Sequence, residues 1–86
     1  MNSATKKNKA YRDKQEIIYT ILNASRAPKT KTKIIYESMI SSEQCNEYFE
    51  ELINQGLLRY NQIKRTYIST TKGLKFIEVY EGLKDK

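Results

Sequence analysis

Apolar residues recur with a helical period in the first third of the chain. A stripe of four Ile and Leu residues between positions 17 and 22 predicts a helix that begins near Arg12. Asp13 and Glu16 lie close to its start, where negative charge favours the helix dipole. Pro28 disfavours helical backbone in the residue before it, so the helix ends ahead of this proline.

Two further helices are expected after a brief polar segment. Either Thr30 or Thr32 is placed to cap a short second helix, whose apolar residues are Ile34, Ile35 and Met39. Ile40 and Ser41 then interrupt the pattern.

The third helix carries the strongest boundary signals. Ser41 precedes Gln44 by three positions, which is the spacing of a capping box, and predicts a helix from about Ser42 to Gln55. Gly56 follows where a left-handed C-cap residue is needed.

The period changes in the next segment, which is rich in β-branched and aromatic residues. Leu58 and Tyr60 share one face of a first strand, and residues 66–69 form a second, with a loop around residues 62–65. Thr70 then caps a last helix that runs to about Lys84.

The order of elements is helix, helix, helix, hairpin, helix. It predicts an α+β fold, a winged helix-turn-helix with three helices, a β-hairpin wing and a C-terminal helix. We expect this domain to occupy residues 12–86, preceded by a flexible basic N-terminal arm at residues 1–11. The predicted core comprises Ile17, Ile21, Leu22, Ile34, Ile35, Phe49, Leu52, Leu58 and Leu74, with Tyr36 and Tyr48 packed beside it.

Charge is unevenly distributed along the 86 residues. The net charge is +6, yet residues 37–58 contain five Glu and no base. The segments on either side, residues 1–36 and 59–75, carry net charges of +7 and +5. A basic balance favours an anionic partner such as nucleic acid. The acidic third helix therefore lies between two basic segments.

The residue types argue against several classes of chemistry. With no histidine and one cysteine, Cys45, we expect no metal site, no cofactor and no enzymatic activity. Cys45 falls on the apolar side of the third helix and is expected to be inert packing. No apolar run approaches the ~18 residues of a membrane span. The lone thiol favours a cytoplasmic location.

Four segments together resemble the archaeal winged helix-turn-helix regulator domains. They are RDKQEIIYTIL, KTKIIYES, EYFEELINQGLL and YISTTKGLKFIEVYEGL, and they cover about residues 12–84. The features that carry the resemblance are Thr32–Lys33 before the second helix, the Leu52–Leu58 ending of the third, and the Thr70–Gly73 opening of the last. The resemblance implies double-stranded DNA binding and a role in transcription.

In such a domain the first turns of the third helix face the major groove. Ser42, Gln44 and Asn46 are therefore candidate DNA-binding residues. The side-chain amides of Gln44 and Asn46 can pair with adenine. Helix capping explains the same residues equally well. Glu50 and Glu51 fit a solvated helix face.

Affinity must come from the basic flanks, since phosphate contacts supply most of the attraction to DNA. The candidates are Lys29, Thr30, Lys31 and Lys33 before the second helix, and Lys64 and Arg65 at the wing tip. The alternative is that these lysines only solvate a small protein.

Three further possibilities stay open. The last helix has a broad apolar surface, and Phe76, Val79, Tyr80 and Leu83 could form a homodimer interface. The acidic third helix could instead be a protein–protein docking face. A small basic protein could also coat nucleic acid without sequence preference.

Overall fold

The structure is a computed structural model that describes residues 13–84. Its elements are α2 (Lys14–Ala24), α3 (Lys31–Ser38), α4 (Ser42–Asn54), β1 (Leu58–Asn61), β2 (Thr66–Ser69) and α5 (Thr71–Lys84). The α+β winged-helix order is therefore confirmed. The predicted arm at residues 1–11 lies outside the described residues, and so does Arg12.

Helix boundaries follow from side-chain caps. Asp13 begins α2, because its carboxylate accepts a hydrogen bond from the Glu16 backbone N–H at 2.8 Å. Thr30, rather than Thr32, caps α3 by accepting from the Lys33 N–H at 3.3 Å. The hydroxyl of Thr70 accepts from the Gly73 N–H at 3.1 Å and so caps α5.

The helix-turn-helix is closed by two different devices. α3 ends at Met39, whose backbone is left-handed at φ 57°. Two residues later the predicted capping box is present: Ser41 Oγ accepts from the Gln44 N–H, and Gln44 Oε1 accepts from the Ser41 N–H. α4 then runs to Asn54, and Gly56 adopts the left-handed backbone expected of it, with φ 78°.

β2 is the central strand of the small sheet. It pairs antiparallel with β1 in a register that places Tyr60 opposite Tyr67. On its other side it pairs with the segment between α2 and α3: Lys29 and Tyr67 exchange backbone hydrogen bonds of 3.1 and 2.8 Å. The Ser69 N–H also donates to the Ser25 carbonyl at 2.8 Å. The hairpin is thus bonded to the start of the helix-turn-helix.

The hydrophobic core lies where α2 meets the other helices and the base of the hairpin. Most of the predicted core is confirmed; the buried apolar residues are Ile17, Ile18, Ile21, Leu22, Ile34, Ile40, Cys45, Phe49, Leu52, Leu57, Leu58 and Ile77. Ile35 and Tyr48 pack against this cluster and are half-buried.

Two residues predicted to lie in or beside the core are exposed instead. Leu74 is 41% exposed, and Ile77, at 1%, takes its place. The reason is that Gly73 lets α5 approach the chain after α4, which turns Gly73 and Ile77 inward and Leu74 outward. Tyr36 is 82% exposed, because Ile34 already faces the core and Tyr36 lies on the other side of α3.

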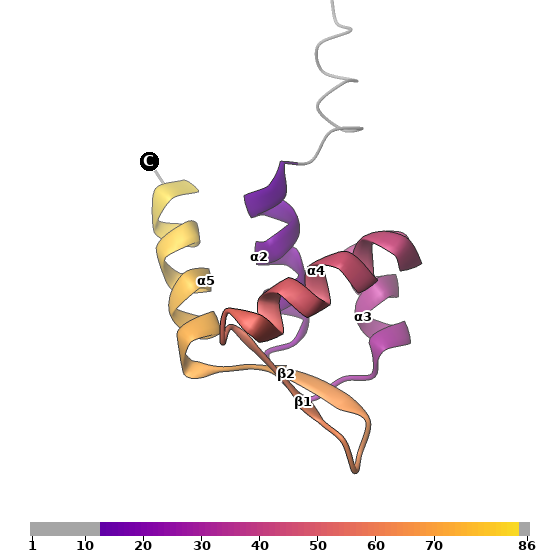
Figure 1. Ribbon diagram of the computed structural model, residues 1–86. Helices are drawn as coiled ribbons and strands as arrows, with labels where there is room; N and C mark the ends of the chain where they lie inside the picture. Colours follow the sequence, from indigo (N-terminus) through magenta and orange to yellow (C-terminus); the bar gives the residue numbers. More distant parts are fainter. Residues whose placement is uncertain (1–12, 85–86) are drawn as a thin grey trace, which may run out of the picture.

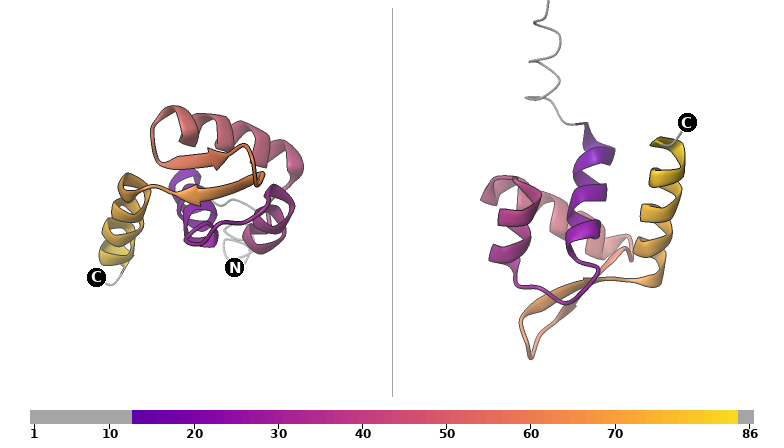
Figure 2. Two further views of the ribbon diagram at one scale, coloured as in Figure 1. Left: turned by 90° about the horizontal axis from the view of Figure 1, so that it is seen from below. Right: turned by 180° about the vertical axis from the view of Figure 1, so that it is seen from behind.

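Figures 1 and 2 show how these elements are arranged. α2 lies between α5 on one side and α3 on the other, and α4 crosses it. The hairpin lies at the opposite end of the molecule from the first turn of α2 and the last turn of α5.

Candidate nucleic-acid interface

α4 presents a buried and an exposed side, as the amphipathic pattern predicts. Cys45, Phe49 and Leu52 are buried against the core. Ser42 and Asn46 are exposed near the start of the helix, where a recognition helix meets base edges. Gln44 is exposed too, but its carbonyl oxygen is occupied by the capping box. A bidentate contact to adenine needs both polar atoms of the amide, so it would break this cap.

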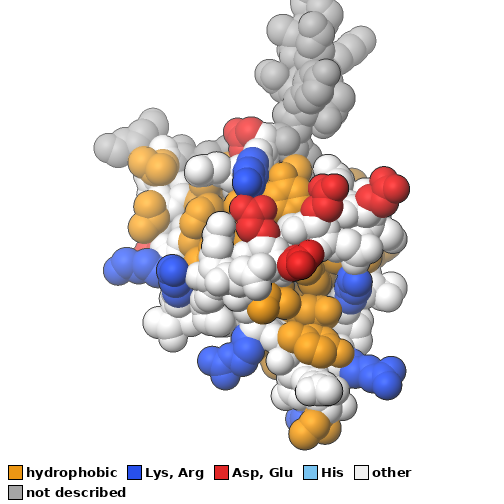
Figure 3. Space-filling view, in the orientation of Figure 1, with side chains coloured by type: hydrophobic (Ala, Val, Ile, Leu, Met, Phe, Trp, Pro, Cys, Tyr) orange, Lys and Arg blue, Asp and Glu red, His pale blue; other side chains and the backbone are white. Residues whose placement is uncertain are grey.

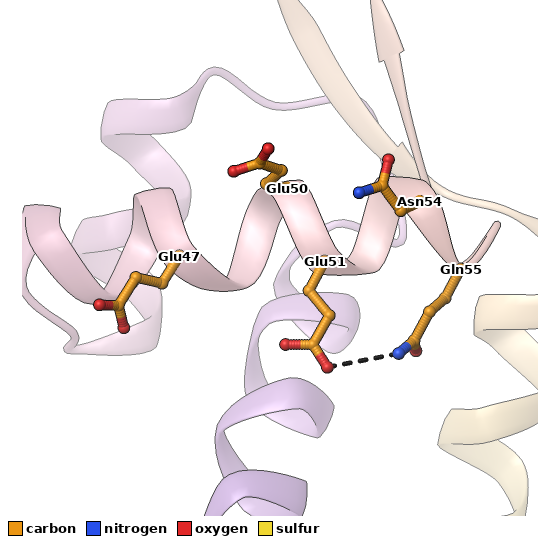
Figure 4. Close-up of a pocket in the computed structure, with 5 residues that line it drawn as sticks. All are labelled: Glu47, Glu50, Glu51, Asn54 and Gln55. Atoms are coloured by element: carbon orange, nitrogen blue, oxygen red, sulfur yellow. Dashed lines mark hydrogen bonds between the residues drawn. The ribbon is translucent and has the colours of Figure 1, made fainter.

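The acidic part of α4 forms an open surface and not a converging site. Glu47, Glu50, Glu51, Asn54 and Gln55 line a shallow hollow of about 300 Å³. In Figure 4 these side chains project to both flanks of the helix. Among residues 13–84 no group of three or more acidic, histidine or cysteine side chains is arranged to hold a metal ion.

One of these glutamates has partners within the molecule. Glu51 accepts from the Lys14 ammonium of α2 at 3.1 Å and from the Gln55 amide at 3.3 Å. Exposed pairs of this kind stabilise a protein by about 0–1 kcal/mol. They support the solvated-face interpretation of Glu51.

The basic segment before α3 is less available than its sequence suggests. The Lys29 ammonium binds the Glu37 carboxylate at 2.9 Å, and both side chains are partly buried. The Thr30 hydroxyl is used as the helix cap. Lys31 is half-buried and Lys33 is exposed at the first turn of α3. Of the four residues proposed from this segment, Lys33 has the most accessible charge.

The wing carries accessible positive charge. Lys64 and Arg65 are exposed in the loop between the strands, and neither forms an ion pair with any residue from 13 to 84. Arg59 is exposed on β1 of the same hairpin. Figure 3 shows Lys and Arg side chains around the hairpin and acidic side chains over α4.

Aromatic rings fix the wing to the body of the protein. The ring of Tyr67 lies 4.6 Å from that of Phe49 on α4 and 4.6 Å from that of Tyr60 on the paired strand. Burial raises the pKa of Tyr67 above its ordinary value. These contacts favour a packing role for Tyr60 and Tyr67 over stacking on bases.

Cys45 is fully buried, as predicted. Burial raises the pKa of its thiol, and the nearby Lys31 ammonium offsets only part of that effect. The thiol is therefore protonated at neutral pH and unsuited to redox sensing.

The predicted dimer face of α5 is divided in the structure. Tyr80 stacks on Tyr19 of α2 at 4.7 Å and so serves the contact between α2 and α5. Phe76 stacks on Tyr80 within α5 at 6.2 Å and packs against the core. Val79 and Leu83 are exposed.

Three exposed residues near the candidate interface were missed by sequence reasoning. Tyr36 is expected beside the core, Arg59 is not among the candidates, and Ile63 falls in the loop predicted around residues 62–65. Ile63 carried a usable signal, because a β-branched residue is unusual in a tight turn.

Comparison with known proteins agrees with this geometry. Residues 11–86 match a family described as winged helix-turn-helix. Among solved structures, Sso10a-2, a DNA-binding protein from Sulfolobus solfataricus, superposes with a TM-score of 0.78 at 24% identity, over 86% of this chain and 80% of that one. At this identity the likeness shows the fold. No curated protein matches the sequence significantly. In the part of the chain that the structure describes, no helix is long and apolar enough to cross a membrane. Because the family match extends over nearly the whole sequence, the chain belongs to the winged helix-turn-helix family.

Proposed function

We propose that this protein is a double-stranded DNA-binding domain of a transcriptional regulator, with α4 in the major groove and the basic flanks on phosphates. The proposal is carried by one observation: the wing of this winged helix exposes Lys64 and Arg65, whose side chains form no ion pair with any described residue. The similarity in fold to a DNA-binding protein supports it.

Affinity and sequence preference come from different parts of the domain. The exposed cations Lys33, Lys64 and Arg65 supply the attraction to phosphates. Ser42 and Asn46 at the start of α4 are the proposed base-reading residues. Gln44 positions the helix through its capping box, and Thr30 does the same for α3. Lys29 and Lys31 attract phosphates less strongly, because Lys29 is paired with Glu37 and Lys31 is half-buried.

The proposal is tested by the salt dependence of binding, measured by fluorescence anisotropy with random and selected duplexes. Each lost phosphate contact flattens the slope of log affinity against log salt by about 0.9. Lys64→Ala should produce one such change, and the Lys64→Ala, Arg65→Ala double variant nearly twice that. Lys75→Ala removes an equal charge from α5, away from the hairpin tip, and should leave the slope unchanged. Absence of duplex binding at low salt would contradict the proposal.

A second arm of the same experiment separates α4 on DNA from α4 on a protein partner. Asn46→Ala should leave the slope unchanged and reduce discrimination by about 1–3 kcal/mol. Glu47→Gln should strengthen binding to random DNA, because it relieves repulsion of phosphates. If neither variant alters DNA binding, the acidic face of α4 is not at the DNA, and the docking interpretation becomes the better one.

A homodimer through α5 is part of the proposal, since dimers fit palindromic operators. Its exposed contacts would be Val79 and Leu83. Phe76 and Tyr80 would border the interface, and Tyr80 would also hold α5 against α2.

A further inference from the structure

Ile63 is the most exposed large hydrophobic residue in the part of the chain that the structure describes. Its side chain is 91% exposed. It lies in the loop between β1 and β2, beside Lys64 and Arg65. At this position the isoleucine gains nothing from burial in the core, and its side chain is available to a partner.

The loop that carries Ile63 is held in one conformation. The Asn61 side-chain oxygen accepts hydrogen bonds from the N–H groups of Ile63 and Lys64, each at 3.0 Å. The Arg65 N–H donates to the Asn61 carbonyl at 2.7 Å. These bonds use the backbone donors at the tip internally. The wing therefore presents side chains, and not these backbone donors, to a partner.

The base of the hairpin resists displacement. Tyr67 is held between Phe49 and Tyr60, and its backbone is bonded to Lys29. The hairpin is thus connected to the core through Tyr67. An apolar group on such a support can be pushed into a narrow space.

The chemistry around Ile63 matches the DNA minor groove. Lys64 and Arg65 follow Ile63 in the same loop and Arg59 is exposed on β1, and Figure 3 shows Lys and Arg side chains around the hairpin. In the minor groove two rows of phosphates border the edges of stacked bases, and proteins that kink DNA insert an apolar side chain between two base pairs there. One aliphatic residue suffices for such a wedge, whereas it provides little area for a protein interface.

Resting on the proposed DNA-binding function, we propose that Ile63 is an apolar wedge that enters a base step in the minor groove and kinks the duplex. Lys64 and Arg65 hold the phosphates beside that step. Pyrimidine–purine steps such as TA unstack most easily and are the expected points of entry.

The test uses the full chain and a short duplex with a central TA step, in which 2-aminopurine replaces one adenine. Wild type should raise the 2-aminopurine fluorescence by unstacking the base, and should bring dyes at the two duplex ends closer together. Ile63→Ala should abolish both signals and weaken binding about 3- to 30-fold, with an unchanged salt slope. Ile63→Leu should retain both signals, and Leu74→Ala, at an exposed apolar site on α5 outside the proposed interfaces, should match wild type.

The outcomes separate the wedge from the proposed function. If wild type binds the duplex and Ile63→Ala gives the same bend and the same fluorescence, the wedge is wrong and DNA binding stands. If wild type does not bind duplex at low salt, both are wrong. Loss of binding to anionic vesicles on Ile63→Ala, with DNA bending unaffected, would reassign the tip to a membrane surface. Thermal unfolding of Ile63→Ala should match that of wild type, because the side chain has few neighbours to lose.

Discussion

Met39 and Gly56 end successive helices with a similar left-handed backbone, but only one of them is glycine. Their φ angles are 57° and 78°. A β-carbon makes this conformation costly by roughly 1–2 kcal/mol, whereas glycine adopts it freely. Met39 is also exposed, so the core gains little from its side chain. We infer that the turn of the helix-turn-helix carries local backbone strain.

Met39→Gly should therefore stabilise the domain. We expect the free energy of unfolding to rise by about 0.5–1 kcal/mol, which corresponds to a few degrees in Tm. Gly56→Ala is the matched control and should lower stability, because it places a β-carbon at the same kind of position. Thermal unfolding followed by circular dichroism measures both. An unchanged or lower Tm for Met39→Gly would show that contacts of the methionine outweigh the strain.

At the residue scale, sequence reasoning succeeded where the signal was local. The caps at Ser41 and Thr70 and the left-handed Gly56 were predicted, since each depends on neighbours within four positions. The ion pair of Lys29 was not predicted, because its partner Glu37 is eight positions away on α3. Ile63 falls in the predicted loop, but its 91% exposure depends on how far the wing projects from the body of the protein.

At the scale of elements, the first turn of α5 is defined by a close approach of two backbones. A β-carbon built on Gly73 would lie 2.2 Å from the Leu57 carbonyl oxygen, well inside van der Waals contact. The Thr70 hydroxyl reaches the Gly56 carbonyl at 2.6 Å in the same region. The start of α5 is thus pressed against the chain that leaves α4.

Two glycine substitutions in α5 should have opposite effects. Gly73→Ala must displace a backbone, and we expect it to lower the free energy of unfolding by about 1–3 kcal/mol. Gly82→Ala meets no heavy atom within 4 Å and should raise stability by up to about 1 kcal/mol through helix propensity. Urea unfolding of both variants provides the measurement. Equal effects of the two substitutions would contradict the close packing at Gly73.

This contact also explains which part of α5 was predictable. Its start and length were predicted correctly from Thr70 and the apolar spacing. Its rotation was not, because the buried face is chosen by the fit of Gly73 against Leu57. Periodicity left Leu74 and Ile77 on the same side, and only the tertiary contact decides between them.

At the scale of the whole molecule, the exposed part of α5 sets the expected assembly. Burying Val79 and Leu83 against a second copy would favour a symmetric dimer. Sedimentation velocity at micromolar concentrations should detect it, and Leu83→Lys should return the protein to monomer. A monomer at all concentrations would leave α5 explained by its packing on α2 alone.

The architecture was predictable because the helix and strand signals follow one another along the chain in the order of a winged helix. The joining of the wing to the segment before α3 was not predicted. It rests on backbone bonds from Tyr67 to Lys29 and from Ser69 to Ser25, which link residues about forty positions apart. Neither Lys29 nor Ser25 has a side-chain pattern that identifies it as a strand partner.

The same bonds have a consequence for how DNA would be read. They bond the segment before α3 directly to the wing, so under the proposed function the protein would set the spacing between their phosphate contacts. A duplex bound to both must adjust its own shape to that spacing, and the energy of adjustment depends on its base sequence. Under the proposed function, the domain would therefore prefer DNA sites that deform easily, which is indirect readout. An acidic recognition helix with few base-reading side chains is then compatible with sequence preference.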